Sequence, residues 1–121
     1  MADKAIWTGA SGRQYEYQVF DARTNWNDVP GNYIFAAVAQ GRWRASYIGQ
    51  TESFKNRLPN HESWACAAQN GATHVHACVN RGGEQARKAD EADLIASNQP
   101  PCNTQLRQSR NLGLGFGSLR P

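Results

Sequence analysis

The chain has 121 residues, of which 40% are apolar, and it carries a net charge of +3. This size and composition allow one small domain with a modest core, and the lack of a long apolar run excludes a membrane-spanning helix. The positive charge is too small to indicate a nucleic-acid partner by itself, because solubility alone can account for it.

The first thirty residues predict an extension with one strand. Between residues 13 and 20, Tyr15, Tyr17 and Val19 alternate with polar residues, which is typical of a half-buried strand. Residues 25–31 are rich in turn-forming residues. The first seven residues lack the apolar stretch of a secretory signal. We therefore expect a cytoplasmic protein.

A β-hairpin is predicted next. Residues 33–39 are continuously apolar, as expected of a central strand that is covered on both faces. Residues 44–50 follow a turn at 40–43 and read as the antiparallel partner strand.

Two short helices should follow this hairpin. Thr51 or Ser53 can cap the first helix, and Pro59 keeps it short or bent. The second is expected from residue 62 to residue 69, where Asn70 and Gly71 provide a stop.

A third strand and a long helix complete the predicted elements. Residues 73–79 alternate and are β-branched, which favours a strand. Residues 84–98 are rich in helix-forming residues, and two prolines end the helix. Residues 104–121 are predicted to form a basic tail without acidic residues, and its arginines are Arg107, Arg110 and Arg120. Such a tail could follow the phosphates of a nucleic acid, or it could simply be solvated.

Two tripeptides frame the hairpin, Gly31-Asn32-Tyr33 and Tyr47-Ile48-Gly49. Because their strands are antiparallel neighbours, the two tyrosine hydroxyls can converge on one groove. A tyrosine can orient a water molecule or help to deprotonate it. Two ordinary core tyrosines would give the same pattern.

A cation and an imidazole follow the second tripeptide. Arg57 and His61 are four residues apart, so on a continuous helix they would share one face, although Pro59 lies between them. A guanidinium stabilises charge on a phosphoryl group, and an imidazole can accept a proton from water. A solvated arginine and a surface histidine are the alternative.

Glu91 begins a further pattern on the long helix. Leu94, Ile95, Pro100 and Asn103 follow it at offsets of three, four, nine and twelve residues. A single carboxylate can hold Mg²⁺ weakly when phosphate oxygens complete its shell. A surface ion pair with Arg87 or Lys88 is the alternative, and neighbouring Asp90 and Asp93 read as surface charge.

The order and spacing of these residues resemble the GIY-YIG nuclease family, with Asn32 in place of its middle isoleucine. The excision-repair nuclease domain of that family has the same spacing after the glutamate. The resemblance spans residues 31–103, between an N-terminal extension (1–30) and the tail (104–121). It implies an α+β fold: a small three-stranded antiparallel sheet flanked by helices, here with an extra N-terminal strand or hairpin.

The resemblance also implies an activity, a DNA endonuclease that uses one Mg²⁺ or Mn²⁺ ion. His61, Tyr33 or Tyr47 would activate water, Arg57 would stabilise the phosphoryl charge, and Glu91 would hold the metal. The expected substrate is double-stranded DNA, with a homodimer or a partner protein supplying specificity. Residues expected to contact the nucleic acid are Gly49, Arg42, Arg44, Lys55 and Asn103, and Trp43 could stack on a base.

Two other functions stay open. The same fold could bind nucleic acid without cutting it. Alternatively, His74, His76 and Cys78 share one face of the third strand and could form a zinc site in an interaction domain. Cys66, Cys78 and Cys102 show no close pairing, so we expect three free, mostly buried thiols in a reducing cytoplasm.

Overall fold

The structure, a computed structural model, describes residues 3–103. Its strands are β1 (Asp3–Thr8), β2 (Gln14–Asp21), β3 (Gly31–Ala39), β4 (Arg42–Thr51) and β5 (Ala72–Val79). They form one antiparallel sheet in the order β1-β2-β5-β3-β4. The helices within this range are α1 (Phe54–Arg57), α2 (Trp64–Gln69) and α3 (Glu84–Asn98).

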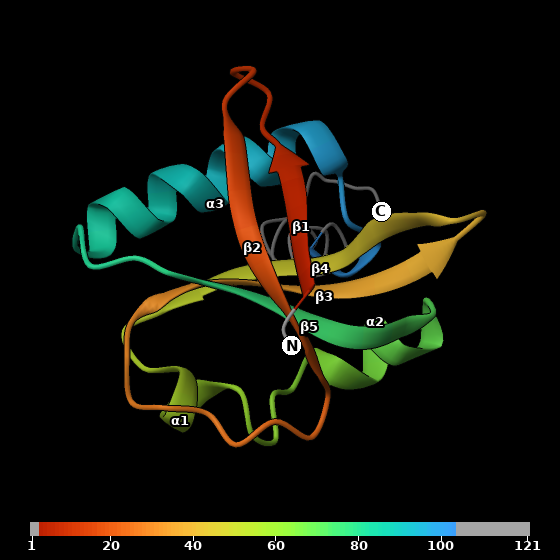
Figure 1. Ribbon diagram of the computed structural model, residues 1–121, viewed down its shortest axis with the longest axis horizontal. Helices are drawn as coiled ribbons and strands as arrows, with labels where there is room; N and C mark the ends of the chain where they lie inside the picture. The colour runs from red at the N-terminus through yellow and green to blue at the C-terminus, as the bar shows by residue number, and fades with distance from the viewer. Residues whose placement is uncertain (1–2, 104–121) are drawn as a thin grey trace, which may run out of the picture.

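The predicted three-stranded sheet flanked by helices is wrong. The sheet has five strands and curls into a half-barrel, and α1 and α2 have only 4 and 6 residues. In Figure 1 the β1–β2 hairpin stands steeply across β3 and β4, which shows how strongly the sheet twists. The sheet is larger than predicted because β5 has a strand on both sides, β2 on one and β3 on the other.

The N-terminal extension contributes two strands to this sheet as a hairpin; the sequence located one of these strands and left a single strand or a hairpin open. In β2, Tyr15 and Tyr17 are buried as their alternation predicted. The missed strand, β1, also alternates, with Ala5 and Trp7 buried and Ile6 exposed. The segment before residue 31 is therefore an integral part of the sheet.

Each face of the sheet carries its own hydrophobic core. Tyr33, Phe35 and Tyr47 pack with α1 and α2 on one face, which we call the tyrosine face. Ile34 and Ile48 pack with α3 on the opposite face, which we call the α3 face. Because both faces of β3 are covered, residues from Gly31 to Ala37 are all buried, which explains the continuous apolar run.

The local signals in the sequence account for most element boundaries. The β3–β4 turn consists of Gln40 and Gly41, both with positive φ, as in a two-residue hairpin turn. Ser53 caps α1 by accepting a hydrogen bond from the backbone N–H of Asn56 at 3.2 Å. The predicted bounds of α3 are confirmed at residues 84–98.

Cys66 and Cys102 form a disulfide, so the prediction of three free thiols is wrong. The bond joins α2 to the segment after α3, across a sequence separation of 36. Cys78 keeps a free thiol. The expectation of a reducing compartment rested on unpaired thiols and loses that support.

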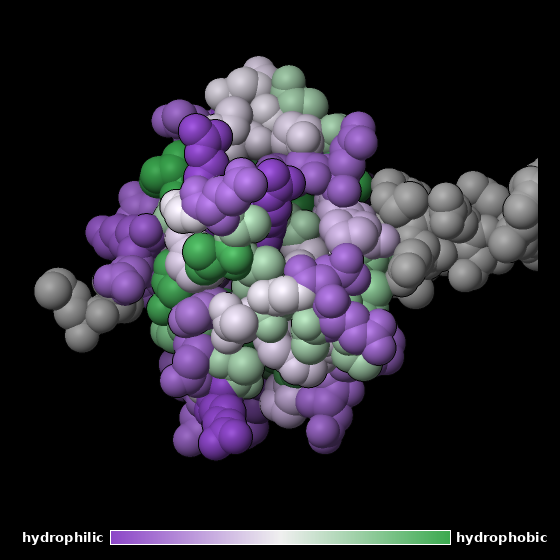
Figure 2. All heavy atoms as spheres, turned by 90° about the vertical axis from the view of Figure 1, so that its right-hand side faces the viewer, coloured by the Kyte–Doolittle hydropathy of each residue, from purple (hydrophilic) through white to green (hydrophobic). Residues whose placement is uncertain are grey.

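The outer surface is mostly polar. Figure 2 shows one side of the molecule, where hydrophilic residues surround small groups of hydrophobic ones. The exposed large apolar residues Ile6, Val38 and Val79 belong to three different strands. Within residues 3–103, no helix has the length and apolar character needed to cross a membrane. The predicted basic tail lies outside the described residues.

Candidate active site

Two tyrosines project side by side from the tyrosine face. Tyr33 of β3 and Tyr47 of β4 lie on neighbouring strands, and their ring centroids are 6.2 Å apart. Both residues are buried, and burial is the main reason that the pKa of each phenol is raised. Either phenol therefore needs nearby positive charge or a hydrogen-bond donor before it can accept a proton from water.

The glycines of the two tripeptides make room for aromatic rings. Gly49 pairs with Tyr33 across the strands, and a Cβ at position 49 would lie 2.5 Å from Cζ and Oη of that tyrosine. A Cβ on Gly31 would collide with the ring of Phe54 and the carbonyl oxygen of Cys78. Gly49, which was expected to contact nucleic acid, thus has a packing role that positions Tyr33.

His61 is hydrogen-bonded to Tyr33. Its Nε2 lies 2.7 Å from Tyr33 Oη, and its Nδ1 accepts a hydrogen bond from the backbone N–H of Ser63 at 3.0 Å. Burial, with a contribution from the Arg57 charge, lowers the pKa of His61 to about 4. The ring is therefore neutral near pH 7, its proton is on Nε2, and it donates that proton to the Tyr33 oxygen.

This geometry changes the role predicted for His61. Its side chain is fully buried, and both ring nitrogens already have protein partners. It is therefore poorly placed to take a proton from water directly. A donor to a phenol oxygen stabilises the phenolate form, so His61 instead makes Tyr33 the better proton acceptor.

Arg57 acts on both phenols through its charge. Its charge lowers the pKa of Tyr33 and of Tyr47, against the larger effect of burial. The predicted helix face shared by Arg57 and His61 does not form, because α1 ends at Arg57 and the chain then turns through Asn60, whose φ is 60°. The turn, rather than a helix, brings His61 back towards the site.

Glu62 occupies the Arg57 guanidinium. The Nη1 and Nη2 groups of Arg57 donate to the two carboxylate oxygens of Glu62 at 2.7 and 2.6 Å. This pair lowers the pKa of Glu62 to about 2 and raises that of Arg57. Glu62 could not be singled out from the sequence, because a glutamate five residues after an arginine has no distinctive pattern.

Glu91 lies on α3, which covers the face of the sheet opposite to Tyr33 and Tyr47. Its negative charge contributes to the raised pKa of Tyr33 and Tyr47, and also to that of Tyr17 on the α3 face. Glu91 is half-buried, and burial raises its own pKa. The alternative ion pairs are not formed: Arg87 Nε donates to Gln50 and Lys88 pairs with Glu84. Among residues 3–103, Glu91 makes no hydrogen bond or ion pair.

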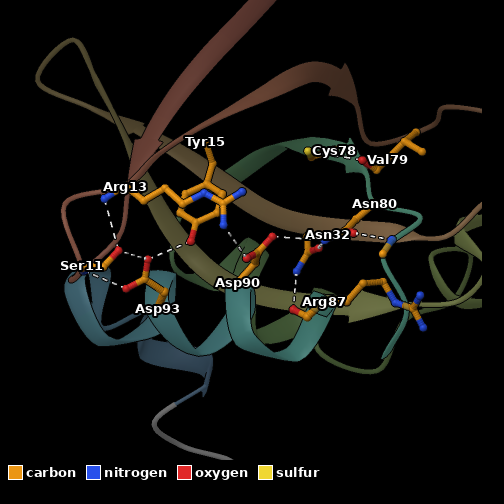
Figure 3. Close-up of polar contacts among 11 residues, drawn as sticks. Ser11, Arg13, Tyr15, Asn32, Cys78, Val79, Asn80, Arg87, Asp90 and Asp93 are labelled. Carbon is orange, nitrogen blue, oxygen red and sulfur yellow. Dashed lines mark hydrogen bonds and ion pairs between the residues drawn. The ribbon is translucent and has the colours of Figure 1, made fainter. Parts of the chain in front are cut away.

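Buried amide groups hold α3 against the sheet (Figure 3). Asn32 Nδ2 donates to the backbone carbonyl of Arg87 at 2.8 Å, and its Oδ1 accepts from Asn80 at 3.1 Å. Asn80 also donates to Asp90 at 3.1 Å. Asn32 is 2% exposed, so the residue that departs from the family motif fixes the helix turn that ends at Glu91. A polar residue inside an apolar strand was the signal for this role.

A second set of contacts ties α3 to the β1–β2 hairpin. Asp93 accepts hydrogen bonds from the Ser11 hydroxyl at 2.7 Å, the Ser11 backbone N–H at 2.8 Å and the Tyr15 hydroxyl at 2.8 Å, as Figure 3 shows. The reading of Asp90, Asp93 and Arg87 as plain surface charge is therefore wrong, and Arg87 is in fact buried. These contacts orient the helix that carries Glu91.

The donor set fits a hard divalent cation that keeps most of its water. Glu91 offers a half-buried carboxylate without a protein partner among the described residues. Residues 3–103 hold no cluster of three or more His, Cys, Asp or Glu side chains that could hold a metal. One carboxylate plus phosphate oxygens is a binding mode of Mg²⁺, whereas structural zinc requires four protein ligands.

Of the five predicted nucleic-acid contacts, three are exposed, whereas Gly49 and Asn103 are buried. Arg44 and Arg42 are exposed on β4, and the strand register puts them on the same face as Tyr47. Lys55 is exposed on α1. Asn103 is buried, accepting from the backbone N–H of Ile48 at 2.8 Å and donating to its carbonyl at 2.9 Å. It caps the outer edge of β4, and its burial keeps it away from a substrate.

The histidines of β5 form an aromatic cluster. His76 Nδ1 accepts from Trp7 Nε1 at 3.0 Å, and the Trp43 ring is 4.4 Å from the His76 ring and 5.3 Å from that of His74. The Trp43 ring is thus occupied by protein contacts, which leaves its predicted base stacking without support. Within the described residues, no group of three His, Cys, Asp or Glu side chains is placed to hold a metal. The zinc site predicted from His74, His76 and Cys78 therefore gains no support.

Comparison with known proteins gives no match, whether against family models, curated proteins or solved structures. The likeness to the GIY-YIG family is therefore one of motifs and their order.

Proposed function

We propose that this protein is a metal-dependent endonuclease that hydrolyses phosphodiester bonds in DNA. One observation carries the proposal: the rings of Tyr33, Tyr47 and His61 pack together on the tyrosine face, with Tyr33 Oη 2.7 Å from His61 Nε2, and the charge of Arg57 on α1 favours the phenolate of both tyrosines. Two tyrosines, a guanidinium, an imidazole and a carboxylate are the groups that single-metal phosphodiester hydrolysis needs.

We propose that Tyr33, after it has lost its own phenolic proton to solvent, accepts the proton of the attacking water. The N–H of His61 donates to its hydroxyl oxygen, and the Arg57 charge favours the phenolate. Tyr47, whose pKa the Arg57 charge also lowers, would orient the water or the phosphate. The water oxygen attacks phosphorus while the bond to the 3′ oxygen breaks and that oxygen takes a proton from solvent, so the product carries a 5′ phosphate, as the family resemblance implies.

Arg57 and Glu91 would handle the charge of the phosphate. The guanidinium matches two phosphoryl oxygens in the same bidentate geometry with which it now holds Glu62. Glu91 would hold Mg²⁺ or Mn²⁺, which supplies positive charge to the phosphoryl and leaving oxygens.

The exposed cations favour a nucleic-acid substrate. Arg42, Arg44 and Lys55 are exposed, and the register puts the two arginines in line with Tyr47 on one face of β4. A row of cations beside a hydrolytic site suits a polyanion that extends beyond the cut. Duplex DNA is the proposed substrate, and a second copy or a partner protein would add specificity.

The test is cleavage of supercoiled plasmid in Mg²⁺ or Mn²⁺. We expect nicking by the wild type and a loss of at least 100-fold in Glu91→Gln and in Arg57→Ala, because these lose the metal ligand and the phosphoryl cation. Chelation of the metal should also abolish nicking.

Matched controls come from the same elements. Glu84→Gln changes an exposed glutamate at the start of α3, and Arg23→Ala changes an exposed arginine outside the site. Both should nick normally. DNA binding without metal-dependent cleavage would refute the nuclease and favour the non-catalytic binding module. Cleavage that survives Glu91→Gln would place the site elsewhere.

A further inference from the structure

A pocket of about 350 Å³ opens on the tyrosine face, away from the proposed cleavage site. Its floor is formed by β2 and β5, and its walls come from the loop before β3 and from α1. None of the residues discussed above as catalytic lines it. The proposed hydrolysis therefore leaves this pocket without a role.

Flat aromatic rings form the walls. Phe20 and Trp26 meet edge to face with centroids 5.1 Å apart, and Trp26 lies 5.7 Å from Phe54. Phe54 is buried, whereas Phe20 and Trp26 remain partly exposed. Such walls suit a flat, unsaturated ligand that stacks or packs against them.

The polar groups of the pocket are mostly neutral amides, from Gln18, Asn25 and Asn27. Glu16 is the one charged residue among the described residues that line it, and it pairs with Lys4 at 3.1 Å. No lining cation is present in that set, so a phosphate has no partner here. Amides that both donate and accept match the edge of a nucleobase.

The pocket and the proposed cleavage site are built on adjacent strands of the same sheet. Gln18, Ala77 and Tyr33 lie in one row across β2, β5 and β3. At about 4.8 Å per strand spacing, the backbone of Gln18 is roughly 10 Å from that of Tyr33. This span is similar to the distance from a phosphate group to the far edge of its base.

Helix α1 joins the two places directly. Phe54 forms part of the pocket wall, and Arg57 at the other end of α1 acts on the two tyrosines. The backbone N–H groups of Phe54 and Lys55 donate to the carbonyls of Val29 and Asn27 at 3.0 and 3.1 Å. The loop that carries Trp26 is therefore fixed relative to α1.

We propose that this pocket binds one unstacked nucleobase of the nucleic acid whose phosphate lies at Tyr33, an inference that rests on the proposed function. A base inside a regular duplex cannot reach such a pocket without leaving its stack. The preferred substrate class is then nucleic acid with an unpaired or extruded base beside the cut. Trp26 supplies stacking area, and Gln18 reads the edge of the base.

The test measures binding of a short single-stranded oligonucleotide to the full chain in chelator, so that no cleavage occurs. One nucleotide at a time is replaced by an abasic residue. In the wild type we expect one position at which base removal weakens binding roughly tenfold, within the range for loss of one base–aromatic stack. In Trp26→Ala, base removal at that position should have no effect.

Gln18→Ala provides a second variant should Trp26→Ala fail to fold, and it should alter which base is preferred at that position. Gln14→Ala is its matched control, on the same strand and face but outside the pocket. Equal effects of base removal at every position, an unchanged profile in Gln18→Ala, or no oligonucleotide binding at all would overturn the proposal. Binding that follows the expected profile without plasmid cleavage would instead refute only the nuclease.

Discussion

Arg57 holds a carboxylate where the proposed reaction requires it to hold a phosphate. Both guanidinium Nη groups donate to Glu62, whose side chain is 66% exposed. An exposed pair of this kind contributes on the order of 1 kcal/mol at most, so an incoming phosphate can replace it. Glu62 would thus compete with the substrate for Arg57.

Glu62→Gln should therefore strengthen DNA binding. Removal of the competing charge frees Arg57, and we expect the dissociation constant measured in chelator to fall about fivefold, the equivalent of ~1 kcal/mol. Titration of labelled DNA followed by fluorescence anisotropy measures this change.

Glu52→Gln is the control, because it makes the same change in net charge at an exposed residue next to α1. The gain from Glu62→Gln should disappear when Arg57 is replaced by alanine. Weaker binding in Glu62→Gln would mean that Glu62 positions Arg57 rather than competes for it.

At the residue scale, the sequence could not show which of the predicted site residues meet. The rings of Tyr33, Tyr47 and His61 pack together, whereas Glu91 lies on α3, which covers the opposite face of the sheet. The roles of Gly49 and Asn103 could not be predicted, since they depend on what lies opposite: the Tyr33 ring in one case and the outer edge of β4 in the other. Asn32 was visible as a polar residue in an apolar strand, but its partner on α3 was not.

At the scale of elements, the edge strand β4 is held from outside by the segment after α3. Asn103 pairs with Ile48, between Tyr47 and Gly49, as a neighbouring strand would. The adjacent Cys102 joins this segment to α2 through the disulfide with Cys66. The two contacts together fix β4 next to the proposed cleavage site.

Loss of the disulfide should therefore lower stability. Cys66→Ser, or reduction of the wild type, removes a cross-link that closes a loop of 36 residues. We expect the free energy of unfolding to fall by about 2–4 kcal/mol. Urea denaturation with and without a reductant gives this value. Cys78→Ser removes a thiol outside the bond and is the control. Equal stability of the oxidised and reduced protein would contradict the prediction.

Local signals in the sequence predicted the elements that have a strong periodicity or a clear terminating residue. Helix α3 and strands β2 to β5 were predicted because alternation, proline and glycine act within a few residues. Strand β1 was missed, since it is short and its first residues show no strong alternation. The disulfide was missed because its cysteines meet only after α2 and the segment beyond α3 come together.

At the scale of the whole molecule, two buried neutral histidines make stability depend on pH. Burial lowers the pKa of His61 and of His76 to about 4, against 6.5 in an unfolded chain. Between pH 6.5 and 4 the unfolded chain binds protons that the folded protein does not. Stability is therefore complete above pH 6.5 and falls as the pH drops towards 4.

His76→Gln should make stability less sensitive to acid. Glutamine keeps an acceptor for the Trp7 indole N–H but does not titrate, so we expect the loss of unfolding free energy between pH 6.5 and 4 to be roughly halved. Urea titrations at several pH values measure the slope. His74→Gln, two residues away on the same face, is the control for the substitution itself. The same slope in His76→Gln as in the wild type would contradict the assignment.

The global arrangement was the least predictable level. The sequence indicated strands in the right places but not that β2 lies beside β5, because strand pairing depends on long-range contacts rather than on local pattern. The family resemblance begins at residue 31, so it gave the strands before that residue no place in the predicted sheet. The alternation in β2 showed that one face of that strand must be covered, but not by what.

The sheet order has a consequence for how the chain is made. The β1–β2 and β3–β4 hairpins are both synthesised before β5, yet only β5 pairs with both of them. On the ribosome, each hairpin must wait with an open edge until residues 72–79 emerge. A nascent chain that stops before this strand holds two separate hairpins instead of a smaller domain, so folding is completed by a strand inserted between partners that are already present.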